Sequence, residues 1–317
     1  MSHPLVSVIT PVYNGATFIA ECIRSVQRQN YAAFNYTIVD NCSRDSTAEI
    51  VRSVIDGDPR MRLVTNTEFV PMVANWNRAI GSVDPQAKYC KPLMADDWLA
   101  PRCLSALVSA AEQQNGVGLV CCYAFNGRDV LWDGFPFSGT PAQLVSFARG
   151  SDVARSGLLG GPYVFGTPSS QLLRMDIVRS RQPFYDESNI HADHASCYDI
   201  LTESDFAFVH EVLTLNRVHE ASQTASAEKN DAMVLGSLAA LARFGPRFLG
   251  TDEYEARIEQ RLERYYRMLG RNALRMRDRS FWSLHRRRMT EIGLPISTPK
   301  VGAAASHWMA WQPLQLP

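Results

Sequence analysis

The sequence predicts an α/β fold: a mostly parallel sheet flanked by helices, with a helical extension at the C-terminus. Short β-branched runs alternate with segments of helical periodicity over the first third of the chain, as in strand-helix-strand units. The chain has 317 residues, of which 46% are hydrophobic and 20% charged, so it can bury a substantial core. No stretch approaches the ~20 consecutive apolar residues of a membrane-spanning helix.

The expected elements follow one another in a regular order. Strands rich in β-branched and aromatic residues are expected at 5–9, 36–39, 62–64, 89–93, 118–123, 171–173, 206–209 and 213–218. Helices with apolar residues three or four apart are expected at 18–26, 46–54, 72–80, 104–111, 193–202 and 254–281. Pro11 to Gly15 is typical of a turn, and Ser46 with Glu49 forms a capping box. Between 123 and 164 the pattern is irregular.

Charge and cysteine content exclude several classes of protein. Lys+Arg and Asp+Glu both total 32, so no overall charge points to a nucleic-acid partner. The seven cysteines are scattered without a C-x-x-C pair, which disfavours a disulfide framework or a zinc site. Reduced thiols and an N-terminus without a secretion signal predict a cytoplasmic protein.

Polar side chains follow three of the expected strands. Tyr13 lies after the first strand, Asp40 closes the second, and Asp96 with Asp97 follows the strand at 89–93. The carboxyl ends of parallel strands meet at one edge of a sheet, where ligands bind. Carboxylates gathered there repel one another unless a cation or a hydrogen-bonding ligand lies between them. A divalent metal that holds a diphosphate would satisfy them, because Mg²⁺ and Mn²⁺ prefer carboxylate and phosphate oxygens.

Each of these residues also has an ordinary structural interpretation. Asp40 could be a turn residue, Asp96 and Asp97 could cap the helix that follows, and Tyr13 could belong to the core. These interpretations do not require the residues to fall together on successive strand ends. Their joint placement therefore favours a ligand site.

Longer motifs surround these residues in a fixed order. They are VSVITPVYNG at 6–15, IVDNCSRDST at 38–47, ANWNRAI at 74–80, LMADDWLAP at 93–101, GTPSS at 166–170, and RVH at 217–219 followed by Ser222. In this order they resemble the family-2 glycosyltransferases with the GT-A fold, a Rossmann-like α/β architecture. The resemblance covers roughly residues 5–225, and an ordered series of motifs is more specific than any one match.

The resemblance implies roles for particular residues. Those implied to bind a nucleotide-sugar donor, with a UDP-sugar expected, are Thr10, Pro11, Tyr13, Asp40, Asn77 and Asp96. Asp97 and His219 would bind Mn²⁺ or Mg²⁺, which neutralises the departing diphosphate. Asp193 would be the general base that takes the proton of the acceptor hydroxyl, so the reaction would invert the anomeric centre.

Three positions depart from the usual family pattern. Met94 replaces a common acid, Ala192 replaces a glutamate, and Pro71 replaces a common glycine. Because Ala192 precedes Asp193, His194 or Asp199 remains an alternative general base. The loop at Pro71 leaves the base and sugar of the donor open.

Two other functions compete with a glycosyltransferase. A non-catalytic nucleotide-sugar-binding or scaffold relative would retain the fold without turnover, and Ala192 is the feature that supports it. A sugar-1-phosphate nucleotidyltransferase is disfavoured, because the loop at 11–15 has neither a glycine run nor an arginine. No G-x-G-x-x-G follows the first strand, which disfavours a dehydrogenase.

The expected organisation is a catalytic domain at 1–225 and a helical extension at 226–317. The extension carries many arginines, including Arg286, Arg287 and Arg288. A solvated helix face is the ordinary interpretation of such a run, and peripheral contact with an anionic membrane surface is the functional one. The resemblance implies a glycan, glycolipid or other hydroxyl acceptor in cell-surface polysaccharide or glycolipid synthesis, at the inner face of the membrane.

Overall fold

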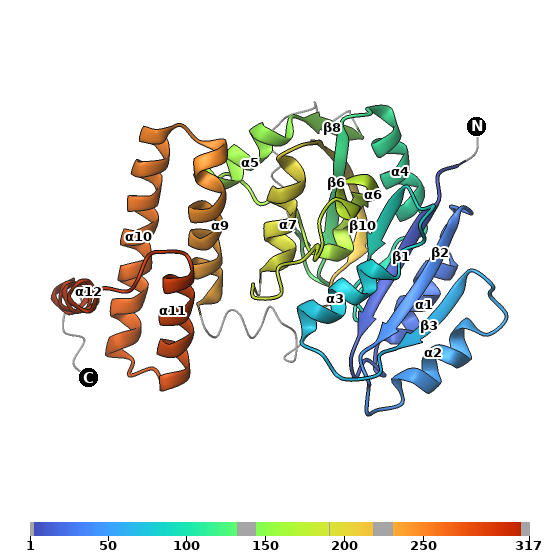
Figure 1. Cartoon of the computed structure of the whole chain (residues 1–317), viewed down its shortest axis with the longest axis horizontal. Helices are drawn as coiled ribbons and strands as arrows, with labels where there is room; N and C mark the ends of the chain where they lie inside the picture. The colour runs from blue at the N-terminus through green and yellow to red at the C-terminus, as the bar shows by residue number, and fades with distance from the viewer. Residues whose placement is uncertain (1–2, 132–143, 190, 218–230, 312–317) are drawn as a thin grey trace. The chain divides into compact units, whose positions relative to one another are not determined.

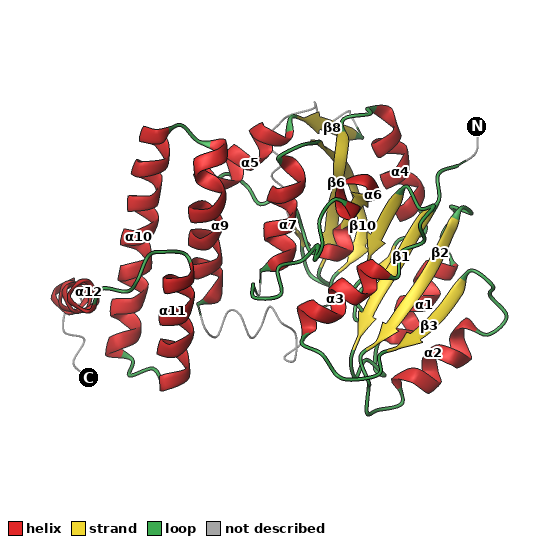
Figure 2. Ribbon diagram, in the orientation of Figure 1, coloured by secondary structure: helices red, strands yellow, loops and turns green. Residues whose placement is uncertain are grey.

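The computed structural model describes residues 3–131, 144–189, 191–217 and 231–311. The chain divides into two compact units, Met1–Arg217 and Val218–Pro317. The predicted domain boundary at 225 lies outside the described residues. Figure 1 follows the chain through both units, and Figure 2 distinguishes the strands of the first unit from the helices of the second.

The first unit contains one sheet, to which ten strands belong within the described residues. They are β1 Val6–Val12, β2 Phe34–Asp40, β3 Met61–Thr65, β4 Tyr89–Pro92, β5 Trp98–Leu99, β6 Val117–Phe125, β7 Val130–Leu131, β8 Val145–Ala148, β9 Gln171–Arg174 and β10 Asp205–Leu215. The order is β3-β2-β1-β4-β9-β6-β10-β5, with β7 paired to β6 and β8 to β10. Neighbours β3, β2, β1 and β4 are parallel, as are β6 and β10, whereas β9 is antiparallel to both β4 and β6. The predicted mostly parallel sheet is confirmed.

Helices connect and cover these strands. In the first unit they are α1 Ile19–Gln27, α2 Thr47–Ile55, α3 Met72–Gly81, α4 Cys103–Gln113, α5 Gly150–Leu159, the 3₁₀ turn η1 Pro168–Ser170, α6 Met175–Arg179 and α7 Ala192–Leu201. Alternate residues of β1, Val6, Val8 and Val12, share one buried cluster with the apolar face of α1, including Ile19 and Ile23. Period-two strand faces and period-3.6 helix faces thus meet in the core, as the sequence predicted.

Three local predictions for the first unit are wrong. The first strand runs to Val12, so Pro11 lies within β1 rather than in the turn, and both Thr10 and Pro11 are buried. The strands expected at 206–209 and 213–218 are one strand, β10, whose pairing with β6 shifts register between Val209 and Val212. Such a bulge interrupts the periodicity without ending the strand. Ser46 is the N-cap of α2, but its side chain makes no capping hydrogen bond.

The second unit is helical. It contains α9 Ala232–Phe248, α10 Thr251–Leu274, α11 Arg279–Glu291 and α12 Thr298–Trp311. Its core includes Leu238, Tyr265, Leu269 and Phe281. Gly270 allows α10 and α12 to approach closely, because a Cβ there would lie 2.7 Å from the backbone of Ala304. The second unit therefore has a hydrophobic core of its own.

The helix expected at 254–281 is two helices. Met276, between α10 and α11, has a φ of 49°, which is left-handed and cannot continue a helix. The Asp278 side chain then accepts a hydrogen bond from Phe281 N at 2.9 Å and caps the start of α11. The apolar repeat continues across this break, so the sequence pattern did not reveal it.

Candidate active site

The loops after β1 and β2 are fixed to each other at the carboxyl edge of the sheet. Asn14 N donates to Ser43 Oγ at 2.8 Å, and Arg44 N donates to Asn14 Oδ1 at 2.8 Å. Asn14 adopts a φ of 51°, a conformation in which asparagine is tolerated better than most residues. The reciprocal bonds hold the ends of neighbouring parallel strands together, where the sequence predicted the donor site.

Asp40 is the last residue of β2 and is 2% exposed. Both of its carboxylate oxygens lie 3.3 Å from the same donor, Ser43 N. A carboxylate has room for about four hydrogen bonds, so one shared backbone donor leaves acceptor capacity. Asp40 therefore supports its own loop, which agrees with its interpretation as a turn residue. Its carboxylate can still accept a hydrogen bond from a ligand N–H.

Two aromatic rings lie beside this edge. Tyr13 is 41% exposed, which excludes the interpretation as a core residue, and Phe69 is 58% exposed. Their ring centroids are 4.9 Å apart at an interplanar angle of 60°. Asn41 positions the Phe69 loop by donating to Val70 O at 2.8 Å and accepting from Val70 N at 3.1 Å. Exposed aromatic rings held by ordered loops suit the planar face of a nucleobase.

Asp97 is enclosed by hydrogen-bond donors from distant parts of the chain. Its Oδ2 accepts from Ser169 Oγ at 2.5 Å and from Asn216 Nδ2 at 2.6 Å, and its Oδ1 accepts from Arg217 N at 3.1 Å. Asn216 Nδ2 also donates to Thr167 Oγ1 at 2.8 Å. These bonds fix the plane of the Asp97 carboxylate relative to the end of β4.

The charge of Asp97 is poorly compensated. Burial raises the pKa of the Asp97 carboxyl to about 7, with the neighbouring Asp96 adding to the rise, although its hydrogen bonds oppose the change. The guanidinium of Arg217 is directed elsewhere, since it pairs with Glu21 and lies 4.8 Å from the ring centroid of Phe18. Asp96 is partly exposed, unlike the buried Asp97. The pair therefore combines a fixed, desolvated carboxylate with a more accessible one.

Thr167, Ser169 and Asn216 were not among the site residues predicted from the sequence. The signal that could have found them was present, because Thr167 and Ser169 belong to the GTPSS motif and Asn216 precedes RVH. Asn216 is 7% exposed, and its Oδ1 has no hydrogen-bond partner within the described residues. A buried carbonyl oxygen without a donor is a candidate acceptor or cation ligand.

Asp193 lies in the first turn of α7 and is partly buried. Burial raises the pKa of its carboxyl, and backbone N–H groups of the turn, chiefly that of His194, reduce the rise. The His194 ring is 5.2 Å from Tyr163 and 5.0 Å from Tyr198, measured between centroids. Burial lowers the pKa of His194 to about 4, so its imidazole is neutral at pH 7. A carboxylate with a raised pKa is a stronger base than an exposed aspartate.

The segment 163–171 connects the surroundings of Asp97 with those of Asp193. Phe165 packs against His194 and Tyr198 at centroid distances of 5.8 and 5.3 Å. Gly166 follows with a φ of 64°, which favours glycine, and the chain then reaches the residues that bind Asp97 and Asn216. One short segment therefore contacts both carboxylate regions.

Asn77 is engaged by protein groups. Its Nδ2 donates to Tyr185 O at 2.8 Å and to Glu187 Oε1 at 3.0 Å, and its Oδ1 accepts from Tyr185 N at 2.8 Å. The amide thus ties α3 to the loop before α7, and its role in donor binding stays a prediction. His219 lies outside the described residues, so its role as a metal ligand also stays a prediction.

The described residues fit a divalent cation that also binds substrate. Among them, no group of three or more His, Cys, Asp or Glu side chains could hold a metal. Mg²⁺ is nevertheless commonly bound by one or two carboxylates together with substrate phosphates. Asp97, with its poorly compensated charge, and the more accessible Asp96 supply the one or two carboxylates that such a site needs, and Asn216 Oδ1 is a further buried oxygen without a hydrogen-bond partner among the described residues.

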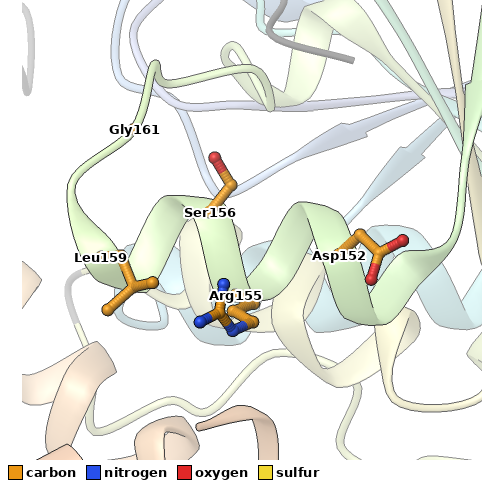
Figure 3. Close-up of a pocket in the computed structure, with 5 residues that line it drawn as sticks. All are labelled: Asp152, Arg155, Ser156, Leu159 and Gly161. Carbon is orange, nitrogen blue, oxygen red and sulfur yellow. The ribbon is translucent and has the colours of Figure 1, made fainter. Parts of the chain in front are cut away.

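A cavity of about 390 Å³ lies elsewhere, along α5 and the turn after it. Its lining residues, drawn in Figure 3, are Asp152, Arg155, Ser156, Leu159 and Gly161. None of the residues predicted from the sequence lines it. We assign it no part in the candidate site.

Comparison with solved structures identifies the fold. TarS of S. aureus (residues 1–349, in complex with UDP) superposes with a TM-score of 0.58 and 14% identity, over 82% of this chain and 71% of that one. The mannosyltransferase PcManGT from Pyrobaculum calidifontis, in complex with GDP-Man and Mn²⁺, gives a TM-score of 0.58 and 15% identity, over 98% and 81%. At such low identity these similarities establish the class, which is the GT-A fold.

Sequence comparison then gives the family. The family profile described as Glycosyl transferase family 2 matches residues 7–181, more than half of the chain. The chain belongs to glycosyl transferase family 2, and the resemblance noted in the sequence is confirmed.

The matches to named relatives cover only part of this chain and part of each relative. An uncharacterized glycosyltransferase of Haemophilus influenzae is 36% identical over 101 residues, 32% of this chain and 39% of that protein. The putative teichuronic acid biosynthesis glycosyltransferase TuaG of Bacillus subtilis is 31% identical over 135 residues, 42% of this chain and 50% of that protein. The matches thus span half or less of these relatives.

Proposed function

We propose that this protein is an inverting glycosyltransferase that moves a sugar from a nucleotide-diphosphate sugar to an acceptor hydroxyl. The proposed reaction depends on Mn²⁺ or Mg²⁺ and belongs to cell-surface polysaccharide or glycolipid synthesis. Residues 1–225 would form the catalytic domain and 226–317 a helical extension. Family membership supports the general reaction class, and the complexes of TarS with UDP-GlcNAc and of PcManGT with GDP-Man and Mn²⁺ support the kind of donor and cofactor.

The observation that carries the proposal is the fixed, desolvated carboxylate of Asp97 beside Asp96 at the end of β4. A carboxyl group whose pKa is raised to about 7 gains strongly from a nearby cation, because the cation stabilises its charged form. Asp96 and Asp97, with Asn216 Oδ1, would hold a divalent ion. When bound, that ion would neutralise charge on the departing diphosphate.

The other residues would bind and deprotonate the organic substrates. Tyr13 and Phe69 would flank the nucleobase, and Asp40 would accept a hydrogen bond from one of its ring nitrogens. Asp193 would accept the proton of the acceptor hydroxyl as the new bond forms. Burial raises the pKa of Asp193, so its ionised form is a stronger base than an exposed aspartate.

The first experiment measures melting temperature with UDP-GlcNAc, GDP-mannose and other nucleotide sugars, with Mn²⁺ or with EDTA. A ligand that binds the folded state stabilises it, so the correct donor should raise the melting temperature only with the metal. The selected donor is then tested for release of nucleoside diphosphate. A scaffold relative would bind the donor without metal-dependent release, and a retained anomeric configuration in the product would contradict inversion.

A further inference from the structure

The turn between α10 and α11 exposes large apolar side chains. Leu274 is 40% exposed and Met276 is 89% exposed. The turn itself is ordered by backbone bonds, since Met276 N donates to Ala273 O at 3.2 Å and Arg277 N to Asn272 O at 3.4 Å. This is the pattern of a Schellman motif, which satisfies the last carbonyl groups of a helix.

Met276 occupies the position of that motif where glycine is usual. With a φ of 49°, its Cβ is crowded by the backbone, a strain that glycine would avoid. An exposed methionine gains nothing from core packing there, and apolar exposure lowers solubility. A residue that is both strained and exposed suggests a role in binding.

The turn lies within the most basic part of the chain. Between residues 264 and 288 there are nine arginines and one aspartate, a formal net charge of +8 in a chain whose total is zero. The aspartate is Asp278, whose carboxylate is used to cap α11. Arg275 and Arg279 are exposed on either side of Met276, and Arg277 lies 4.8 Å from the ring centroid of Phe281. We call Leu274, Arg275, Met276, Arg277 and Arg279 the basic tip.

We propose that the basic tip docks on membranes that contain anionic lipids. Met276 and Leu274 enter the headgroup boundary, and the arginines bind lipid phosphates. Charge complementarity selects this partner. Four arginines of this stretch pair with nearby carboxylates, namely Arg267, Arg271, Arg287 and Arg288, but Arg275 and Arg279 are exposed beside Met276 and carry charge that suits a polyanionic surface. Stable docking generally needs two signals, and the basic tip combines apolar side chains with a polybasic patch. Among the described helices, none has the length and apolar character needed to cross a bilayer.

The test is co-sedimentation of the full chain with vesicles. The native protein should bind phosphatidylcholine vesicles that contain phosphatidylserine, should not bind phosphatidylcholine alone, and should dissociate as salt is raised. Met276→Gly should weaken binding severalfold without lowering the melting temperature, because glycine relieves the left-handed strain. Met276→Leu should retain binding. Vesicle binding is measured without glycosyl transfer, so its failure would not contradict the proposed function.

The charge contribution is tested with a matched pair of double variants. Arg275→Gln with Arg279→Gln should weaken binding about 25-fold, at about fivefold for each arginine near a lipid surface. Arg28→Gln with Arg52→Gln removes the same charge from exposed positions in the first unit and should change binding little. The proposal would be overturned if both double variants lost vesicle binding equally, or if Met276→Gly bound vesicles as the native protein does. Self-association through the basic tip without vesicle binding would also overturn it.

Discussion

Asp97 and Asp193 are both carboxylates whose pKa is raised by burial, but their surroundings differ. Asp97 is held by side chains and backbone 72 to 120 positions away in sequence. Asp193 is supported locally, by N–H groups in the first turn of its own helix, with the aromatic rings around His194 beside it. The first arrangement fixes the orientation of a carboxylate, and the second leaves a carboxylate available to accept a proton. The difference suggests distinct tasks, cation binding for Asp97 and proton transfer for Asp193.

The largest effect is expected for Asp193→Asn, which keeps the shape of the side chain but cannot accept the proton. Loss of a general base typically lowers kcat by roughly 10²–10⁴-fold. Donor affinity should stay close to native, because none of the proposed donor residues lies on α7. Steady-state kinetics and calorimetric binding of the donor measure the two quantities.

Asp199→Asn is the matched control, since Asp199 lies on the same helix and is an alternative base. It should keep most of the activity. A large loss of activity in Asp199→Asn, with little change in Asp193→Asn, would make Asp199 the general base in place of Asp193. In the native enzyme, the rate should fall as pH drops through the raised pKa of the base, since only its ionised form accepts a proton.

The next effect concerns stability without divalent cations. Because the pKa of Asp97 is about 7 when folded and 3.8 ordinarily, the folded state holds this proton more tightly than the unfolded state. The contribution of Asp97 to stability therefore falls as pH rises from about 4 to 7, by roughly 3 kcal/mol between pH 5 and pH 8. Urea unfolding of the native protein and of Asp97→Asn, each at pH 5 and at pH 8, measures this change in stability.

The difference between the two proteins isolates Asp97. His194 acts in the opposite direction, since its lowered pKa of about 4 makes stability rise with pH between about 4 and 6.5, but it is common to both proteins. Manganese at pH 8 should restore stability to the native protein and not to Asp97→Asn. The same pH dependence in both proteins would show that the Asp97 proton does not titrate in this range.

A third expectation concerns the manganese requirement of the two adjacent carboxylates. Asp96→Asn and Asp97→Asn should each raise the manganese concentration needed for half-maximal activity, by roughly 10–100-fold, the usual cost of disturbing metal ligands or their supports. Asp58→Asn, which removes a carboxylate bonded to Arg60, should leave the requirement unchanged. Native manganese dependence in both variants would exclude the pair as the metal site.

The sequence predicted the sheet and the acidic strand ends because both depend on local pattern. Apolar periodicity placed the strands before Asp40 and Asp96, and parallel connections bring such ends to one edge. It missed α5, which lies in the irregular stretch between 123 and 164, and it gave no bounds for α9 within the predicted helical extension. The motifs at 166–170 and 217–219 marked the segments that carry the donors around Asp97, but their pairing with Asp97 was missed because it spans 72 and 119 residues, which a local pattern does not show.

The smallest effect is expected for Ser169→Ala. Ser169 Oγ donates to Asp97 Oδ2 and accepts from Met94 N at 3.0 Å, so its loss should cost about 1–2 kcal/mol of stability. With one donor fewer, the ionised form of Asp97 is less stable and manganese affinity should fall severalfold. The neighbouring Ser170, equally buried, bonds Thr214 Oγ1 at 3.2 Å instead. Ser170→Ala should therefore lose similar stability with native manganese activation, and Ser169→Thr should recover part of the affinity. If both alanine variants lowered manganese affinity equally, Ser169 would support the fold without positioning Asp97.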